Sequence, residues 1–137
     1  MRVSNRVDYG VRALYDLACH GGSGPVQSRD IARRQGLPEP YLHQLLGALG
    51  RGGLVRSTRG PQGGHRLTRS PETVTLLDIW RVLEGRDRHA GDERPRRRDA
   101  IGEAWDQIQC DFEAQLRAVS LQTLIERSGS APADYSI

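Results

Sequence analysis

The sequence predicts a mainly α-helical protein with a small β-hairpin wing: a winged helix-turn-helix domain followed by a long C-terminal dimerisation helix. Three observations lead to this prediction. Two helical patterns flank a short turn at residues 36–38, and two extended segments joined by a glycine-rich loop follow them. Apolar residues then return with helical spacing from residue 100 onward. Two helices about a tight turn, followed by a basic ribbon, are typical of a module that places one helix in the DNA major groove.

Charge is distributed unevenly along the 137 residues, a length that suits one ordinary domain. All 20 basic side chains are arginine. Residues 1–70 contain 11 Arg and 4 acidic residues, a net charge of +7, whereas residues 71–137 contain 9 Arg and 13 acidic residues, a net charge of −4. Genomic base composition explains the missing lysine but not this asymmetry, which indicates a polyanionic partner at one end of the molecule.

The cysteine content and hydropathy pattern indicate the compartment. Cys19 and Cys110 are far apart in the sequence, and no signal peptide or apolar run of membrane-spanning length is present. We therefore expect a soluble, cytoplasmic protein with no membrane partner and no disulfide framework.

The first predicted helix runs from Asn5 to about His20, with Ser4 or Asn5 as its cap. Asp8 and Arg12 stand four residues apart, as do Arg12 and Asp16, and we expect surface ion pairs at both spacings. The apolar face of this helix comprises Val7, Val11, Leu14, Tyr15 and Ala18.

A short edge strand at residues 26–27 is expected to lead into the second helix, which Ser28 caps. Arg33 and Arg34 are expected to face outward from this helix. Gly36 supplies a left-handed residue that ends it, and the third helix opens near Pro40. The buried stripe of the third helix is Leu42, Leu45, Leu46 and Leu49, and its outward residues are Tyr41, His43, Gln44, Gly47, Ala48 and Arg51.

The wing is predicted from two strands, residues 54–59 and 65–69, that pair antiparallel. Their connecting loop has three glycines and a proline in six positions, which allows its backbone to approach another surface closely, and Arg59 lies at its base. Thr75 then caps a fourth helix, which Gly85 ends.

The remaining chain divides into three parts. Residues 86–99 form an exposed basic loop, in which Arg94, Arg96, Arg97 and Arg98 suit an anion or DNA phosphates, although such a run is more often a solvated face. Residues 100–127 form a helix too apolar to stand alone, so we expect an antiparallel interface with a second copy, with intramolecular packing as the alternative. Residues 128–137 form a flexible tail, and residues 1–85 are the DNA-binding domain. The predicted dimerisation residues are Trp105, Ile108, Phe112, Leu116 and Val119.

Four stretches carry a resemblance to a known family. They read MRVSNRVDYGVRAL, DIARRQGLPEPYLHQLL, GLVRSTRGPQGGHRL and VTLLDIWRVLEG, in this order between residues 1 and 85. Their order and spacing resemble the IscR/NsrR/CymR-type family of bacterial winged-helix regulators. The resemblance implies a homodimeric transcription regulator, usually a repressor, that binds a partly palindromic operator in double-stranded DNA.

The resemblance also implies which residues contact DNA. It implies that the outward residues of the third helix face the major groove, where Gln44 can pair with adenine, and that Arg59 and the glycine hairpin reach the minor groove. His43 stands where some members carry glutamate, so the base preference is expected to differ. The full predicted DNA-binding set is Ser28, Tyr41, His43, Gln44, Arg51, Arg56, Arg59, Gly63, Gly64 and Arg66.

The region that binds an iron–sulfur cluster in some members of this family departs from the family pattern in this chain. Cluster-binding members carry three cysteines between the fourth helix and the dimerisation helix, and this chain has none there. Asp8, the position of a carboxylate ligand in some members, is expected to pair with Arg12 instead. We therefore expect no iron–sulfur cluster, no cofactor and no metal site, and His20, His65 and His89 are interpreted as surface histidines.

Three routes for a signal remain open: a small-molecule effector, a protein effector, or a thiol switch at Cys19 or Cys110. For both cysteines a buried, inert thiol is the preferred interpretation. The alternative function is a winged-helix protein–protein adaptor that does not bind DNA specifically, against which the wing arginines argue. An enzyme is not expected, because no nucleophile–base pair or phosphate-binding loop before a helix is present.

Overall fold

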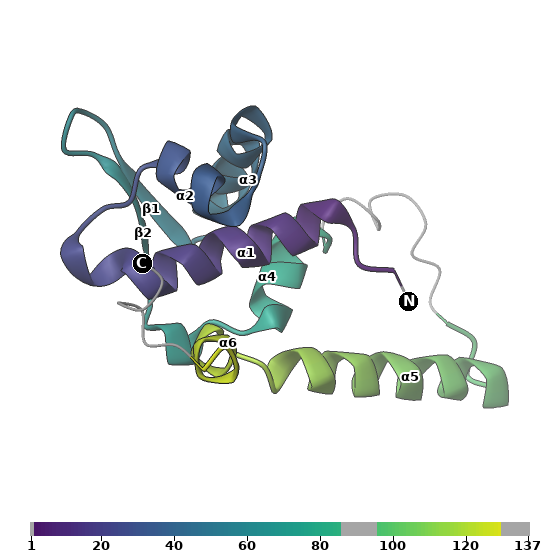
Figure 1. The fold of residues 1–137 in the computed structure, drawn as a ribbon. Coiled ribbons are helices and arrows are strands. Elements are labelled where there is room, and N and C mark those ends of the chain that lie inside the picture. Colours follow the sequence, from purple (N-terminus) through teal and green to yellow (C-terminus); the bar gives the residue numbers. More distant parts are fainter. Residues whose placement is uncertain (1, 86–95, 130–137) are drawn as a thin grey trace.

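The computed structural model describes residues 2–85 and 96–129. Figure 1 shows helix α1 running through the middle, with α2, α3 and the β-hairpin on one side of it and α4, α5 and α6 on the other. The elements are α1 (Asn5–His20), α2 (Ser28–Gln35), α3 (Glu39–Arg51), β1 (Val55–Thr58), β2 (Gly64–Leu67), α4 (Leu76–Leu83), α5 (Ala100–Arg117) and α6 (Leu121–Arg127), with 3-10 turns at Gly21–Ser23 and Pro71–Thr73. None of the described helices is long and apolar enough to cross a membrane.

A single apolar core surrounds α1, because helices pack on two sides of it. The predicted leucine stripe of α3 is confirmed, since all four leucines are buried. Ala48, which was expected to face outward, is buried as well and belongs to the same core. The N-terminal cap of α1 is Ser4, whose hydroxyl accepts a hydrogen bond from the Val7 backbone N–H at 3.3 Å.

The two predicted ion pairs of α1 have opposite outcomes. Asp8 and Arg12 form the expected exposed pair, with Nε 3.1 Å from the carboxylate. The predicted pair of Arg12 with Asp16 is wrong, because Asp16 is completely buried beneath α2. Arg34, expected to face outward, instead donates to both carboxylate oxygens of Asp16 at 2.9 and 2.7 Å, and Gln35 donates a third bond at 3.1 Å. A desolvated carboxylate needs these donors, and α2 supplies them.

The turn between α2 and α3 follows the prediction, and the start of α2 does not. Gly36 adopts the left-handed conformation, with φ of 66°, and ends α2. The prediction that Ser28 caps α2 is wrong: Ser28 is the first residue of the helix, and Gln27 holds the capping position without a side-chain hydrogen bond. The Ser28 hydroxyl is thereby free of the helix and lies 3.3 Å from Nε2 of His43 in α3.

The hairpin is fastened to the body by one extra bridge. Val26 pairs with His65 of β2 through two backbone hydrogen bonds of 2.9 and 2.8 Å, so the predicted edge strand is a single bridge. At this point the backbones are very close, because a Cβ on Gly64 would lie 2.7 Å from the Val26 carbonyl oxygen. Gly64 also has φ of 151°, a conformation that favours glycine.

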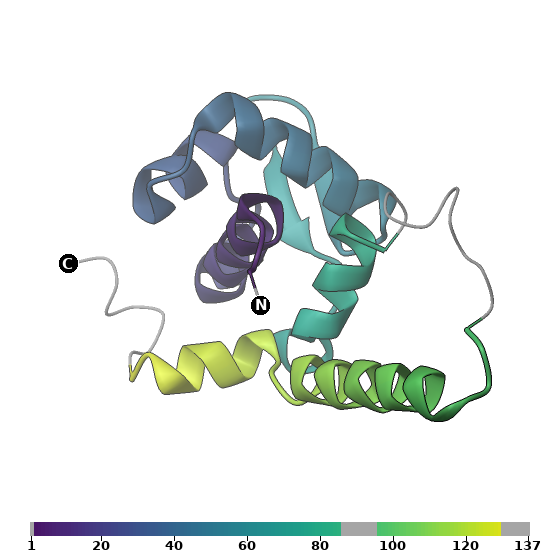
Figure 2. The same cartoon turned by 90° about the vertical axis from the view of Figure 1, so that its right-hand side faces the viewer.

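The predicted C-terminal helix of residues 100–127 is wrong in one respect, since it is broken into α5 and α6 at residues 118–120. Ser120 starts α6 with a capping box that includes Thr123, and it forms a β-bridge with Thr75. The Val119 carbonyl accepts from the Leu76 N–H, so Val119 belongs to this joint rather than to a helical stripe. The break directs α6 back onto α1, as Figure 2 shows, while α5 extends away from the body.

Only part of the predicted basic loop can be placed. Arg94 and the rest of residues 86–95 lie outside the described residues, as do His89 and residues 130–137 of the predicted tail. Arg96 donates to Asp106 at 2.8 Å and to Gln109 at 2.6 Å, both on α5. Its guanidinium is therefore engaged within the chain.

Candidate nucleic-acid interface

The outward face of α3 begins the candidate interface. His43 and Gln44 are exposed. They lie on the side of α3 that faces away from the core, because the leucine stripe buries the other side of the helix. Tyr41 is half-buried, because its ring packs edge-on against Tyr9 of α1 with centroids 5.8 Å apart. This contact fixes the first turn of α3 against α1, and His43 and Gln44 beyond it are exposed to solvent.

The start of α2 adds to this face. The Ser28 hydroxyl and His43 are within hydrogen-bond distance, and Glu39 lies 3.7 Å from the same ring nitrogen. Two predicted residues from different helices, Ser28 and His43, therefore meet here, and Glu39, which was not predicted, lies beside them. Arg29, which was not predicted, is exposed beside Ser28 and lines a cavity of about 460 Å³ between α2 and the wing loop. Its position next to Ser28 at the start of α2 was the sequence signal for it.

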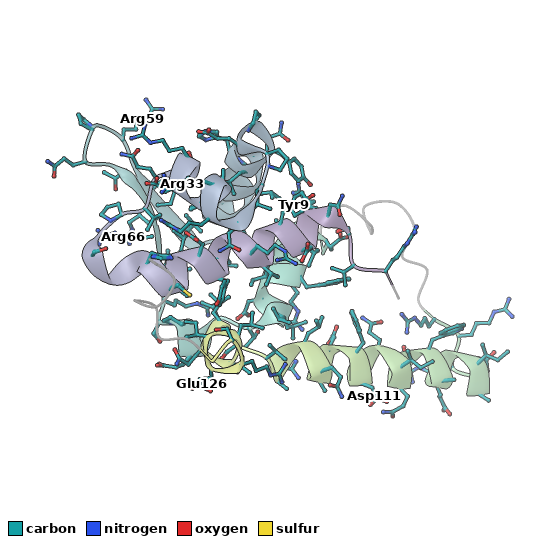
Figure 3. All side chains as sticks on the ribbon, in the orientation of Figure 1. Tyr9, Arg33, Arg59, Arg66, Asp111 and Glu126 are labelled. Atoms are coloured by element: carbon teal, nitrogen blue, oxygen red, sulfur yellow. The ribbon has the colours of Figure 1, made fainter. Side chains whose placement is uncertain are left out.

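The wing presents arginines in an unfavourable arrangement. Arg56 and Arg66 are both exposed and directly opposite each other in the antiparallel register. Like charges at such positions destabilise a hairpin unless an anion lies over them. Arg59 is exposed in the loop, and Figure 3 shows it at the far end of the hairpin. The wing therefore carries three guanidinium groups suited to a polyanion.

The glycines of the wing have a clear role within the protein. Gly63 is buried, and a Cβ there would lie 2.8 Å from the carbonyl carbon of Arg59. Gly64 allows the close approach to Val26. Their predicted role was to bring backbone close to DNA, and in the structure they close the hairpin tightly, which positions Arg59.

His65 links the wing to α3 electrostatically. Burial lowers the pKa of His65, and the neighbouring charge of His43 lowers it further. Its Nδ1 lies 2.7 Å from the Ser57 hydroxyl, and the ring is half-buried rather than on the surface as predicted. His65 is therefore mainly neutral at neutral pH, and its hydrogen bond with Ser57 joins the two strands of the hairpin.

Two arginines of this half of the chain are set apart from these groups. Arg51 lies at the C-terminal end of α3, about 10 Å along the axis from Gln44 at a rise of about 1.5 Å per residue. There it lines a cavity with Arg6 and Arg81 rather than joining the wing. Arg69 is paired with Asp78 of α4 at 3.1 Å. The gathered set is therefore Ser28, Tyr41, His43, Gln44, Arg56, Arg59 and Arg66, with Arg29 added.

Comparisons with known proteins agree with this geometry. A family described as Rrf2, iron-dependent transcriptional regulator, matches residues 3–127. The chain is similar to the HTH-type transcriptional regulator CymR of Bacillus subtilis, with 36% identity over 127 residues, covering 90% of this chain and 89% of that protein. The solved structure of T. potens IscR has a TM-score of 0.78 and 39% identity, covering 93% of this chain and 88% of that one. The structure of B. subtilis CymR has a TM-score of 0.76 and 35% identity, covering 93% and 98%.

The family description implies iron, and the residues present do not fit an iron centre. A cluster needs about four ligands, and the chain has two cysteines on separate helices. Cys19 is buried as predicted, and burial raises the pKa of its thiol, whereas Cys110 is exposed, against the prediction. Within residues 2–85 and 96–129, no three His, Cys, Asp or Glu side chains are grouped to hold a metal. Asp8 is held by Arg12.

Proposed function

The chain belongs to the Rrf2 family of DNA-binding transcription regulators, and we propose that it is a cytoplasmic repressor that binds a partly palindromic operator as a homodimer without an iron–sulfur cluster. The observation that supports this proposal best is the shared placement of exposed polar residues on α3 and exposed arginines on the wing. A recognition helix followed by a basic hairpin is the arrangement with which such a domain contacts a major groove and the minor groove beside it.

The proposed operator contacts divide into two kinds. Gln44 and His43 read base edges in the major groove, where a glutamine pairs bidentately with adenine. Arg59 enters the minor groove, whose raised negative potential attracts arginine. The opposed pair of Arg56 and Arg66, together with Ser28 and Arg29, contacts phosphates and fixes the register of the protein on the duplex.

The homodimer is proposed from the exposed half of α5. Ile101, Trp105 and Ile108 form a stripe on one face of the helix, with exposed fractions of 68%, 57% and 57%. The stripe continues into the protein's own core, because Phe112 packs on Trp80 at 5.1 Å and Leu116 lines an apolar groove with α1 and α4. In an antiparallel pair, each exposed half covers its partner, and the two α3 helices are then related by a two-fold axis.

The repression mechanism follows from that symmetry. Two α3 helices related by a two-fold axis recognise two inverted half-sites, so the operator is partly palindromic. Occupancy of a promoter by the dimer excludes polymerase. Because the ligand set for iron does not fit, we propose that a small molecule or a protein partner controls occupancy.

The function is tested by incubating the purified protein with fragmented genomic DNA and sequencing the retained fragments. We expect a short two-fold-symmetric motif upstream of a few genes. A well-folded protein that enriches no sequence with or without cell metabolites contradicts the proposed function and favours an adaptor that does not bind DNA.

The Arg59 contact is tested on the fragment recovered in that way. Arg59→Ala is expected to weaken binding by about 1–3 kcal/mol, the cost of one lost groove contact. The matched control is Arg127→Gln, which removes an exposed arginine from α6 on the far side of α1. Fluorescence anisotropy at fixed salt measures both variants, and equal affinities for Arg59→Ala and the wild type exclude the proposed role of the wing.

A further inference from the structure

A second concentration of arginines lies at the opposite end of α3 from the residues proposed to read the operator. A cavity of about 460 Å³ opens where the N-terminal end of α1 meets the C-terminal ends of α3 and α4. Figure 2 shows these three helix ends next to one another. Each end contributes one guanidinium group, and none of the described residues that line the cavity is acidic. The lining residues are Arg6, Ala48, Arg51, Gly52, Arg81, Val82 and Leu83.

The floor of this cavity is built by close packing. A Cβ on Gly52 would lie 2.5 and 2.6 Å from the two methyl groups of Val82, so the end of α3 rests directly on α4. Arg6 donates from Nε to the Leu83 carbonyl at 3.1 Å, which ties α1 to the end of α4. These contacts fix the three helix ends relative to one another, and the three arginines project from them around the cavity.

The guanidinium groups are largely uncommitted. Within residues 2–85 and 96–129, Arg51 makes no ion pair or hydrogen bond, and the terminal amino groups of Arg6 make none either. Arg81 approaches Glu113 of α5 only at 3.6 Å, with its side chain 57% exposed. The C-terminal dipoles of α3 and α4 offset part of the repulsion among the three charges, but no carboxylate of the described residues pairs with Arg51.

We propose that this cavity binds a small polyvalent anion that carries two or more carboxylate or phosphate groups. Arginine forks bind such groups bidentately, and three forks around one concavity favour a ligand with several anionic groups over chloride. The volume lies in the range of small-molecule sites. A bound anion bridges the end of α3 to α1 and α4, so it acts on the helix that is proposed to read the operator. This regulatory consequence rests on the proposed function, whereas the binding itself does not.

The probes are citrate and inorganic pyrophosphate, titrated calorimetrically into the full-length protein without DNA at an ionic strength held constant with sodium chloride. We expect saturable binding of one anion per chain. The double variant Arg51→Gln/Arg81→Gln is expected to weaken this binding at least about tenfold, because it removes two charge-assisted contacts. Arg127→Gln, the control, is expected to bind as the wild type does, and circular dichroism establishes that all three proteins are folded.

Three results overturn the proposal: no saturable heat from either probe, unchanged binding by the folded double variant, or an equal loss in Arg127→Gln. Operator affinity measured on the same proteins separates this failure from that of the proposed function. A wild type that binds operator but neither anion leaves the function standing and removes the anion site. If the double variant also loses operator affinity in that case, the arginines are DNA phosphate contacts. A wild type that binds the anions but no DNA supports the anion site and contradicts the proposed function.

Discussion

Asp8 and Asp16 show how two identical spacings in one helix acquire different energetic roles. Both stand four residues from Arg12. Asp8 forms an exposed pair, while Asp16 is completely buried and is held by Arg34 and Gln35 of α2. Surface ion pairs contribute little, because water solvates each partner well, whereas removing one partner of a buried pair leaves a charge without compensation.

Asp16→Ala is therefore expected to lower the free energy of unfolding by about 3 kcal/mol, since Arg34 loses its bidentate partner in a site that is only 26% exposed. Asp8→Ala is the matched control and is expected to cost less than about 1 kcal/mol. Urea denaturation followed by circular dichroism measures both. Equal losses in the two variants contradict the assignment of Asp16 as the buried anchor of α2.

Burial of individual side chains was predictable from the sequence for some residues of the helices and not for others. The leucine stripe of α3 was predictable because its spacing is strict and its outward neighbours are polar. The partner of Asp16 was not, because the choice between Arg12 on the same helix and Arg34 on the next depends on how α2 packs over α1. Cys110 was misjudged for a related reason: its position beside an apolar stripe left its burial undetermined, and the structure exposes it.

At the scale of elements, α4 owes its start to one carboxylate. Asp78 accepts hydrogen bonds from the Thr75 N–H at 3.0 Å, from the Thr75 hydroxyl at 3.1 Å and from Arg69 at 3.1 Å. Burial alone raises the pKa of Asp78, but these hydrogen bonds and the charge of Arg69 outweigh it and hold the pKa below its ordinary value of 3.8. The ionised carboxylate therefore joins the cap of α4 to the base of the wing.

A lowered pKa in the folded state means that ionised Asp78 stabilises the protein at neutral pH. This contribution is fully present above the unfolded value of 3.8 and is lost as the pH falls through the lower folded value. Asp78→Asn is expected to reduce the urea midpoint at neutral pH, with the gap to the wild type closing in acid. Glu72→Gln, at an exposed carboxylate in the preceding turn, is the control. A gap that stays constant with pH contradicts the assignment.

The elements themselves were predictable where capping and periodicity agreed. Thr75, Gly36 and Ser4 each mark a helix boundary that the structure confirms. The break between α5 and α6 was missed, although the step from Val119 to Leu121 is two residues and leaves the helical spacing, and Ser120 is a residue type that caps helices. Tertiary bonds decide the break: the Leu76 N–H and the Val74 carbonyl take up the backbone groups of Val119 and Leu121, so the helix ends there.

At the scale of the whole molecule, the exposed stripe of α5 separates two kinds of apolar residue that the sequence presented as one set. Phe112 and Leu116 pack within the chain, so their truncation is expected to damage the fold whether or not it also affects association. Trp105, by contrast, is 57% exposed. It is therefore the residue whose loss reports on the proposed dimer.

Trp105→Ala is expected to convert the proposed dimer to monomer at micromolar concentration, since a buried aromatic anchor at an interface contributes about 2 kcal/mol or more. Gln107 lies outside the apolar stripe and donates to Asp111 on the same helix, so Gln107→Ala is expected to remain dimeric. Analytical ultracentrifugation distinguishes the two. A dimer that survives Trp105→Ala places the interface on another surface.

The bridge between Thr75 and Ser120 has a consequence for operator architecture. The bridge joins the C-terminal end of α5 to the segment that leads into α4, and this contact constrains the angle at which α5 leaves the body. In the proposed dimer, that angle and the length of α5 set how far apart the two copies of α3 stand. In that proposed dimer, the bridge between Thr75 and Ser120 therefore helps to set the number of base pairs between the inverted half-sites, although neither residue belongs to the proposed DNA-binding set.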